Sequence, residues 1–314
     1  MDIKNKGFKM NNENIDFKKL TDFNSFNLKK IKMIQKFHEV RDEIEFNLNV
    51  RTNLSCNFKC SYCYVRTNLN QDKNYLNPKI FNKWVNFIIK NIQDYQVFLY
   101  KRKIFKKVML DMSLLGGETF ILKNDIIDQY LSVLNKYPDI TRINILTNGY
   151  FIDKMIYFMN KYEKNNLNYY ISFHQEQISF NKFYNKLKKL KNNINENLIK
   201  NIKVAFLSND PESLKEEFKA VKELGIDVEI NELYYYSYFD FFSKNKINRV
   251  CHALTFNLKY DDPLYIYHKC YPDQKIRLID KKINFKKYIF NCNKACTCAK
   301  DELWIYKEKY FIKD

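Results

Sequence analysis

Apolar and polar residues alternate strictly just before the first cysteines of the chain. Ile44, Phe46, Leu48 and Val50 are apolar, and the residues between them are polar or charged. Because the side chains of a strand point alternately to its two faces, this period of two predicts a strand with one buried face. The cysteines that follow are therefore expected on a loop at the end of a strand.

Helix-like and strand-like segments then alternate with little interruption. Apolar residues at helical spacing predict helices over residues 77–95, 125–137, 152–162, 180–190 and 211–224, and short apolar runs predict strands over 108–115, 143–146, 169–173, 202–207 and 228–233. Repeated strand–helix units of this kind predict a parallel sheet. We therefore expect the α/β class, as a partial (β/α)6 TIM-like barrel with its site at the carboxyl ends of the strands.

The pattern divides the chain into three regions. Residues 1–40 are charged and aperiodic apart from a short helical pattern near residues 28–37, and they form an N-terminal extension. Residues 41–240 make the core. After that the alternation stops, and residues 241–314 are a small extension that carries five of the eight cysteines.

Composition supports a folded protein with an excess of positive charge. The hydrophobic share is 46% and the net charge is +18, which excludes an intrinsically disordered chain and allows a nucleic-acid partner. However, Lys outnumbers Arg by 47 to 7, whereas phosphate and base recognition favours Arg. A functional basic patch and simple solvated helix faces both remain open.

The chain carries no apolar N-terminal segment and no run long enough for a membrane span, so we expect a cytoplasmic protein that does not insert into membranes. The cytosol keeps thiols reduced. The cysteines are therefore expected to be metal ligands or reactive thiols in preference to disulfides.

Three of the cysteines form a compact CxxxCxxC motif. Cys56, Cys60 and Cys63 lie within eight residues. A zinc site usually pairs two close cysteines with two further ligands elsewhere, whereas three close thiols suit one corner of an iron–sulfur cluster. A zinc knot remains the alternative on spacing alone.

The few glycines stand at the ends of predicted strands. Only five glycines occur in the chain, and Gly116 and Gly117 are adjacent, directly before Glu118. Two neighbouring glycines indicate a close approach of the backbone or a positive φ. Gly149 follows Asn148 in a TNG sequence, which also makes an ordinary left-handed turn.

The fourth predicted strand ends in the sequence ISFHQE. Ser172 and His174 are two residues apart, and they therefore point to the same face, which would be the interior of the barrel. Both are candidates for binding a ligand. His174 could instead hydrogen-bond a neighbouring loop.

These motifs, in this order over residues 43–235, resemble the radical S-adenosylmethionine superfamily. The resemblance implies that Cys56, Cys60 and Cys63 hold a [4Fe–4S] cluster whose open iron binds S-adenosylmethionine. It further implies that the GGE motif contacts the amino group of the methionine moiety and that the end of the fourth strand contacts the ribose or carboxylate. The cofactor-binding residues implied are Tyr62, Gly116, Gly117, Glu118, Asn148, Ser172 and His174.

The C-terminal cysteines form a second group. Cys270, Cys292, Cys296 and Cys298 could complete a closed [4Fe–4S] cluster or a zinc site, with Cys251 as a spare thiol. Residues 275–292 read as a β-hairpin, and the region resembles the SPASM or twitch extension that binds auxiliary clusters. It departs from a full SPASM domain in having five cysteines where seven are usual, and in lacking the glycine expected in the hairpin.

The activity implied is reductive cleavage of S-adenosylmethionine to a 5′-deoxyadenosyl radical that takes hydrogen from a substrate. An external reductant such as flavodoxin or ferredoxin would supply the electron. A peptide or protein side chain is the first choice of substrate, as in the maturases that carry such extensions. The alternatives are a nucleic acid or a nucleotide-sugar as substrate, or a non-catalytic, zinc-bearing protein that binds nucleic acid through its basic charge.

Overall fold

The computed structural model describes residues 43–63, 75–101, 107–208 and 211–232, together with short pieces at 249–251, 255–259, 264–268, 275–277, 283 and 290–292. The N-terminal extension with its predicted helix lies outside these ranges. All statements below concern the described residues.

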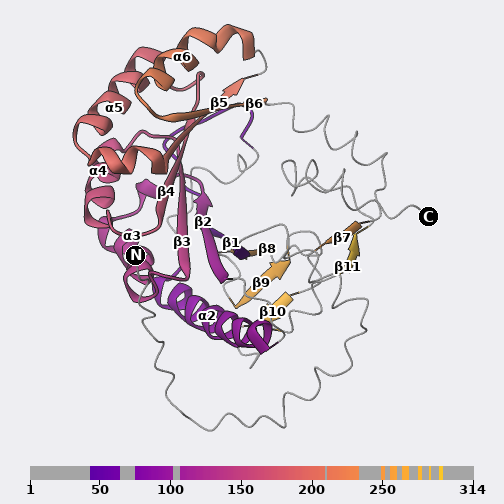
Figure 1. The fold of residues 1–314 in the computed structure, drawn as a ribbon. Helices are drawn as coiled ribbons and strands as arrows, with labels where there is room; N and C mark the ends of the chain where they lie inside the picture. Colours follow the sequence, from indigo (N-terminus) through magenta and orange to yellow (C-terminus); the bar gives the residue numbers. More distant parts are fainter. Residues whose placement is uncertain are drawn as a thin grey trace, which may run out of the picture.

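The predicted alternation of six strands and five helices is confirmed (Figure 1). The elements are, in chain order, β1 (Glu43–Asn53), α2 (Pro78–Lys101), β2 (Lys107–Gly116), α3 (Asn124–Lys136), β3 (Thr141–Thr147), α4 (Ile152–Lys161), β4 (Leu167–Phe173), α5 (Phe180–Asn192), β5 (Ile202–Ser208), α6 (Lys215–Glu223) and β6 (Asp227–Glu232). Each strand pairs in parallel with the next along the chain. This is the open (β/α)6 arrangement of a partial barrel.

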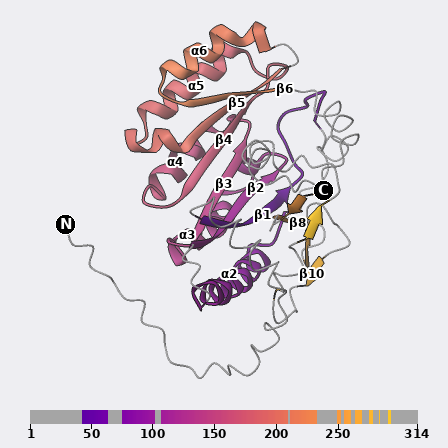
Figure 2. The same cartoon turned by 45° about the vertical axis from the view of Figure 1, so that its right-hand side comes forward.

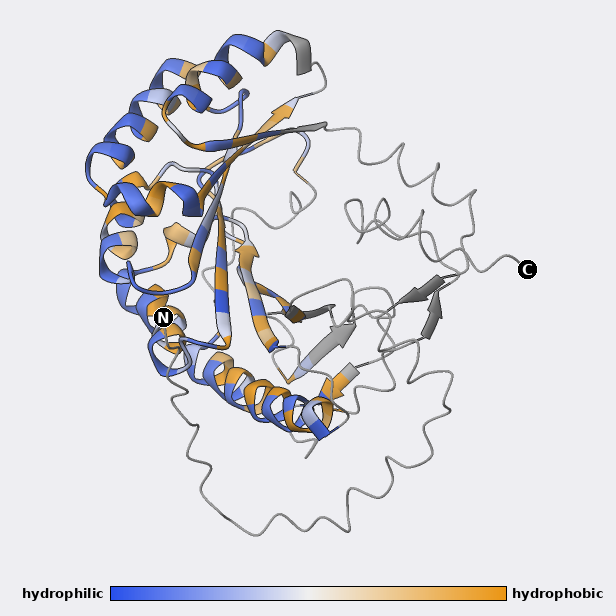
Figure 3. Ribbon diagram, viewed as in Figure 1, coloured by the Kyte–Doolittle hydropathy of each residue, from blue (hydrophilic) through white to orange (hydrophobic). Residues whose placement is uncertain are grey.

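The five helices line one side of the sheet, and strands β1 to β6 fan out beside them (Figures 1 and 2). Each helix carries both hydrophobic and hydrophilic residues (Figure 3). In α2 the apolar residues at helical spacing are buried, among them Phe81, Trp84 and Ile88. They pack beside β2 and form one core with the even-numbered residues of β1, which are also buried, because burial of these apolar faces removes them from water.

Three short 3₁₀ turns lie in the connections between these elements: η3 (Thr119–Ile121), η4 (Glu196–Asn201) and η5 (Pro211–Leu214). The predicted helix from residue 211 therefore begins as a 3₁₀ turn and becomes α-helical at Lys215. A tighter first turn is common at a helix N-terminus. None of the described helices is both long and apolar enough to cross a membrane.

The sheet extends beyond the six predicted strands. Strand β8 (Thr255–Lys259) pairs in parallel with β1, and β9 (Tyr265–His268) and β10 (Lys275–Arg277) follow it as antiparallel neighbours. The resulting order is β10-β9-β8-β1-β2-β3-β4-β5-β6. Segments from the C-terminal region thus belong to the same sheet as the core.

Among the described residues, the two ends of the hairpin predicted over residues 275–292 do not pair with each other. Strand β10 pairs with β9, and β11 (Phe290–Cys292) pairs with β7 (Arg249–Cys251) in a separate two-stranded sheet. The alternation of apolar residues in this segment correctly indicated extended structure. It carried no information on which strands would be neighbours, because edge strands find partners from distant parts of the chain.

One more C-terminal residue is anchored to the core. Ile283 is buried, and its backbone N–H donates to the side chain of Asn91 on α2 at 2.7 Å. The Asn91 amide in turn donates to the carbonyl of Phe87 at 2.8 Å. The buried amide therefore satisfies its hydrogen bonds by joining the helix to the C-terminal segment.

Candidate functional site

The cysteine loop follows β1 directly, as predicted. Cys60 is buried with 5% of its surface exposed, and Cys56 and Cys63 are half-buried; all three are free thiols. A turn closes the second half of the motif, since the N–H of Cys63 donates to the carbonyl of Cys60 at 3.3 Å. The N–H of Phe58 points at the Cys56 sulfur at 3.4 Å. This backbone donor would stabilise a thiolate.

The surroundings of Cys56 and Cys60 disfavour the thiolate forms of these two residues. Burial raises the pKa of Cys60 to about 11, and burial also raises the pKa of Cys56. The neighbouring thiols add to the shift, which means that the three sulfurs lie within electrostatic reach of one another. A bound cation would remove this penalty, because metal ligation favours deprotonated thiols.

The described residues contain no group of three His, Cys, Asp or Glu side chains arranged around one metal ion. An iron–sulfur cube places each thiolate on its own iron atom, so its ligands need not converge on a point. Three thiols on one short loop can each ligate one iron of such a cluster.

The paired glycines allow β2 to approach the cysteine loop. A Cβ atom on Gly116 would lie 2.1 Å from the carbonyl oxygen of Asn53, and one on Gly117 would lie 2.0 Å from that of Ser55. Gly116 also has a φ of 141°. The close contacts are hydrogen bonds: Gly117 N–H donates to Asn53 at 3.0 Å and Glu118 N–H donates to Ser55 at 2.7 Å. The glycines thus fix the backbone just before Cys56.

The carboxylate of Glu118 is committed to the TNG turn. It is 1% exposed and accepts hydrogen bonds from the Thr147 hydroxyl at 2.8 Å, the Asn148 N–H at 2.7 Å and the Phe120 N–H at 2.9 Å. Burial raises the pKa of Glu118, and these donors oppose the shift. Its direct partners here are protein groups that join the ends of β2 and β3.

Asn148 lies against the cysteine loop. Its side-chain amide donates to the Asn57 side chain at 2.9 Å and points at the Cys56 sulfur at 3.8 Å. Gly149 has a φ of 69°, and a Cβ there would lie 2.7 Å from the side chain of Ile171. The left-handed turn is therefore what directs Asn148 to the thiols.

His174 also contacts the cysteine loop. Its Nδ1 lies 3.3 Å from the Cys60 sulfur and 3.0 Å from the Tyr62 hydroxyl, and its ring stacks on Tyr62 with centroids 5.9 Å apart. Phe58 meets the same imidazole edge-on. Burial lowers the pKa of His174 to about 4, so the ring is neutral at pH 7. The sequence left two roles open for His174, binding a ligand or hydrogen-bonding a neighbouring loop. Both are compatible with this position, because the loop that His174 contacts is the one that carries the thiols.

Two residues that the sequence analysis did not single out hold the same loop. The Glu176 carboxylate accepts from the Ser61 N–H at 2.7 Å and from the Ser61 hydroxyl, and the Gln177 side chain accepts from the Lys59 N–H at 2.9 Å. The polar run HQEQ was visible in the sequence, but its partners lie more than a hundred residues away. We call His174, Glu176 and Gln177 the β4 clamp.

Ser172 lies on the face of β4 opposite the helices. Its neighbours Ile171 and Phe173 are buried against the helices, whereas Ser172 is half-buried, as the strand alternation predicted. Ser172 is opposite Ala205 of β5 in the register. Of the predicted cofactor-binding residues, Tyr62 is part of the cysteine loop, Asn148 and His174 contact it, and Ser172 lies on the strand that precedes the β4 clamp.

The second cysteine group is described only in part. Cys270, Cys296 and Cys298 lie outside the described residues. Cys292 belongs to β11 and Cys251 to β7, and the register pairs Phe290 with Cys251 and Cys292 with Arg249. These two cysteines, from positions far apart in the chain, thus lie on paired strands.

Comparison with known proteins supports the fold. No family model matches the chain, and no curated protein matches it by sequence. Among solved structures, it is similar to native anSMEcpe with bound AdoMet and Cp18Cys peptide, with a TM-score of 0.51, 13% identity, and coverage of 78% of this chain and 82% of that chain.

Two further solved structures resemble the chain more weakly. SuiB from Streptococcus suis, bound to S-adenosylmethionine, has a TM-score of 0.42 and 13% identity, covering 88% of this chain and 72% of that chain. BtrN in complex with AdoMet and 2-DOIA has a TM-score of 0.36 and 14% identity, covering 70% and 72%. The similarity to anSMEcpe establishes a shared α/β fold.

Proposed function

We propose that this chain is a radical S-adenosylmethionine enzyme. The observation that carries the proposal is the meeting of three strand ends around the cysteine loop. Asn148 after β3 points at Cys56, His174 after β4 contacts Cys60, and Glu118 after β2 holds the turn of Asn148. These contacts fix the position of the loop, as the binding of a ligand by its three thiols would require.

In this proposal Cys56, Cys60 and Cys63 would hold a [4Fe–4S] cluster, and S-adenosylmethionine would bind to its open iron. When bound, the two groups supply a 5′-deoxyadenosyl radical that removes a hydrogen atom from a substrate. The chain itself holds the cysteine loop through Glu176 and Gln177, and it directs Asn148 toward the Cys56 sulfur. Hydrogen bonds to cluster sulfurs tune reduction potential.

A peptide or protein side chain is the proposed substrate. The similar structure of anSMEcpe contains AdoMet and a peptide, and it shares this fold over 78% of the chain. An auxiliary [4Fe–4S] cluster on Cys270, Cys292, Cys296 and Cys298 is part of the proposal, with zinc as the alternative. An external flavodoxin- or ferredoxin-type reductant would supply the electron, and a cytoplasmic location would suit the reduced thiols.

The test is production of 5′-deoxyadenosine. Protein purified without oxygen and reconstituted with iron and sulfide is mixed with S-adenosylmethionine and dithionite, and the product is measured by chromatography. We expect a brown protein with about four irons for each cluster it holds. Replacing Cys56, Cys60 and Cys63 together with Ala should reduce the product to the level found without protein.

The matched control is Cys251→Ala, which removes one thiol outside the cysteine loop and should leave 5′-deoxyadenosine formation intact. A colourless protein that contains zinc and makes no 5′-deoxyadenosine would contradict the proposal. It would favour the alternative of a zinc-bearing protein that binds nucleic acid.

A further inference from the structure

The face of the sheet opposite the helices is polar, which is unusual for parallel strands. On β1, Phe46 and Leu48 face the helices with none of their surface exposed, whereas Glu45 and Asn47 on the other face are half-buried. Parallel sheets covered on both faces read as continuous apolar runs, and closed barrels fill their interior with branched apolar side chains. We call the polar side the inner face. Its composition suits contact with water or a polar ligand.

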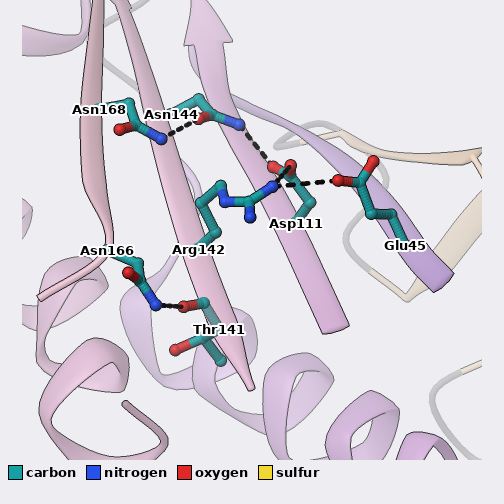
Figure 4. Close-up of polar contacts among 7 residues, drawn as sticks. All are labelled: Glu45, Asp111, Thr141, Arg142, Asn144, Asn166 and Asn168. Atoms are coloured by element: carbon teal, nitrogen blue, oxygen red, sulfur yellow. Dashed lines mark hydrogen bonds and ion pairs between the residues drawn. The ribbon is translucent and has the colours of Figure 1, made fainter. Parts of the chain in front are cut away.

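A charged group spans β1, β2 and β3 on this inner face. The Arg142 guanidinium lies between two carboxylates, 3.0 Å from Glu45 and 3.3 Å from Asp111 (Figure 4). Asn144 donates to the other oxygen of Asp111, and Asn168 of β4 donates to Asn144 at 2.9 Å. One positive charge is thus shared by two negative ones, and amides continue the polar row to the next strand.

A second group of the same composition spans β5 and β6. The Lys203 ammonium lies 2.7 Å from Glu229 and 3.7 Å from Asp227. Tyr170 of β4 lies opposite Lys203 in the strand register and is close enough to Lys203 and Asp111 for both charges to act on it. Tyr170 therefore joins the two groups into one surface.

The sign of this surface is opposite to that of the chain. In the two groups, the four carboxylates of Glu45, Asp111, Asp227 and Glu229 outnumber the two cations of Arg142 and Lys203, whereas the whole chain carries +18. Arg51 and Lys107 lie on the same face, four residues along β1 and β2 from the level of Asp111. A polyanion drawn to the protein by its overall charge would meet repulsion here. A cation would be attracted at short range, where screening by salt is weak.

Exposed apolar surface borders the charged groups. Leu146 is 39% exposed and Tyr170 is 38% exposed, and the two lie opposite each other in the register of β3 and β4. Long basic side chains cover apolar surface with their methylene stems while the charged end reaches a polar group. A leucine and a tyrosine beside carboxylates offer both contacts to one such side chain.

We propose that the inner face binds a positively charged side chain, lysyl or arginyl, of a peptide substrate. The proposal rests on the proposed function in that it names the substrate class of the same enzyme. Nucleic acid, the alternative that the overall charge invites, is disfavoured at this face.

The test uses three probes of similar length on the full chain. The first is a benzophenone-labelled hexapeptide with two lysines. The second is the same hexapeptide with two glutamates in place of the lysines, and the third is a benzophenone-labelled oligothymidine. After irradiation, the labelled peptides of the protein are mapped by mass spectrometry. We expect the lysine probe to label residues 107–116, 141–147 and 167–173, and the other two probes to label these residues less.

Two variants and one control refine the result. Asp111→Asn and Glu229→Gln should each lower labelling by the lysine probe by up to about fivefold, as expected for the loss of one partly exposed charge pair. Asp153→Asn removes the same charge from the outer surface of α4, where Asp153 pairs with Lys189, and should leave labelling unchanged. Circular dichroism verifies that each variant folds. If Asp111→Asn does not fold, Glu229→Gln, which is nearer the edge of the sheet, provides the test.

The inference is overturned if the glutamate probe or the oligothymidine labels the inner face as well as the lysine probe does. Absence of labelling there by the lysine probe, or labelling that neither variant lowers, has the same meaning. Formation of 5′-deoxyadenosine is measured on the same preparations. If 5′-deoxyadenosine forms but the lysine probe is not preferred, the proposed function stands and the inference is refuted. If the lysine probe is preferred but no 5′-deoxyadenosine forms, the binding preference stands and the proposed function is refuted.

Discussion

At the scale of single residues, the motifs owe their form to backbone contacts. Gly117 has no room for a side chain, since a Cβ would lie 2.0 Å from the carbonyl oxygen of Ser55, immediately before Cys56. Gly225 differs in kind, because it has a φ of 83° and open space around its Cα. The first glycine is needed for its size and the second for its conformation.

This difference predicts different effects for two alanine variants. Gly117→Ala should destabilise the fold by about 1 to 3 kcal/mol, as overpacking does, and should displace the cysteine loop. Gly225→Ala should cost about 1 to 2 kcal/mol through its left-handed backbone and leave that loop in place. Thermal unfolding gives the stability, and hydrogen exchange of residues 54–57 reports the loop. Equal exchange in the two variants would contradict the assignment.

The orientation of Glu118 marks the limit of what a motif reveals. The GGE sequence correctly indicated a special strand end, but it said nothing about the direction of the carboxylate. In the structure this group accepts from Thr147, the last residue of the next strand, and from Asn148, which follows it. Such a choice depends on which donors the fold brings near, and spacing along the chain does not contain it.

At the scale of elements, the β4 clamp is the main support of the cysteine loop. Glu176 and Gln177 bind the backbone N–H groups of Ser61 and Lys59, the residues on either side of Cys60. The strand that precedes the clamp is part of the core sheet. The clamp therefore transfers the rigidity of the sheet to a loop that has no regular structure of its own.

Removal of the clamp should loosen the loop before any cofactor is bound. Glu176→Ala should accelerate hydrogen exchange of residues 56–63 by roughly threefold to tenfold, because two hydrogen bonds to a carboxylate are lost at a solvent-exposed site. Glu176→Gln keeps an acceptor oxygen and should restore part of the protection. Gln175→Ala, an exposed neighbour, is the control. Exchange that does not respond to Glu176→Ala would mean that the loop is held by other contacts.

The helices and strands of the core were predictable because apolar residues recur at helical spacing in the helices and at every second position in the strands. The helix spacing of α2 and the alternation of β1 both report one buried face. Strand β8 was not predicted, although its five residues, TFNLK, alternate polar and apolar side chains as those of a half-buried strand do. Its place beside β1 depends on the assembled sheet.

At the scale of the whole molecule, the polar inner face affects stability as well as binding. Burial raises the pKa of Asp111, nearby Glu45 raises it further, and Arg142 only partly offsets the shift. A carboxyl group whose pKa is higher in the folded than in the unfolded state contributes stability below its unfolded pKa, and this contribution is lost as the pH rises through the folded pKa.

The stability of the wild-type protein should therefore fall, relative to Asp111→Asn, as the pH rises from about 4 through the raised pKa of Asp111. The asparagine keeps the shape and does not ionise. Thermal unfolding of both proteins without cofactors, at several pH values, measures the difference. A difference that stays constant with pH, or that grows in favour of the wild type, would show that the carboxylate is not destabilised by burial.

The pairing of β8 with β1 has a consequence for synthesis on the ribosome. Strand β1 is among the first elements made, but one of its two edges is covered by residues 255–259, about two hundred positions later. At typical rates of translation this edge stays open for about ten seconds or more. During that time an unpaired parallel strand is a template for other chains, so expression yield should depend on how quickly the C-terminal segment follows.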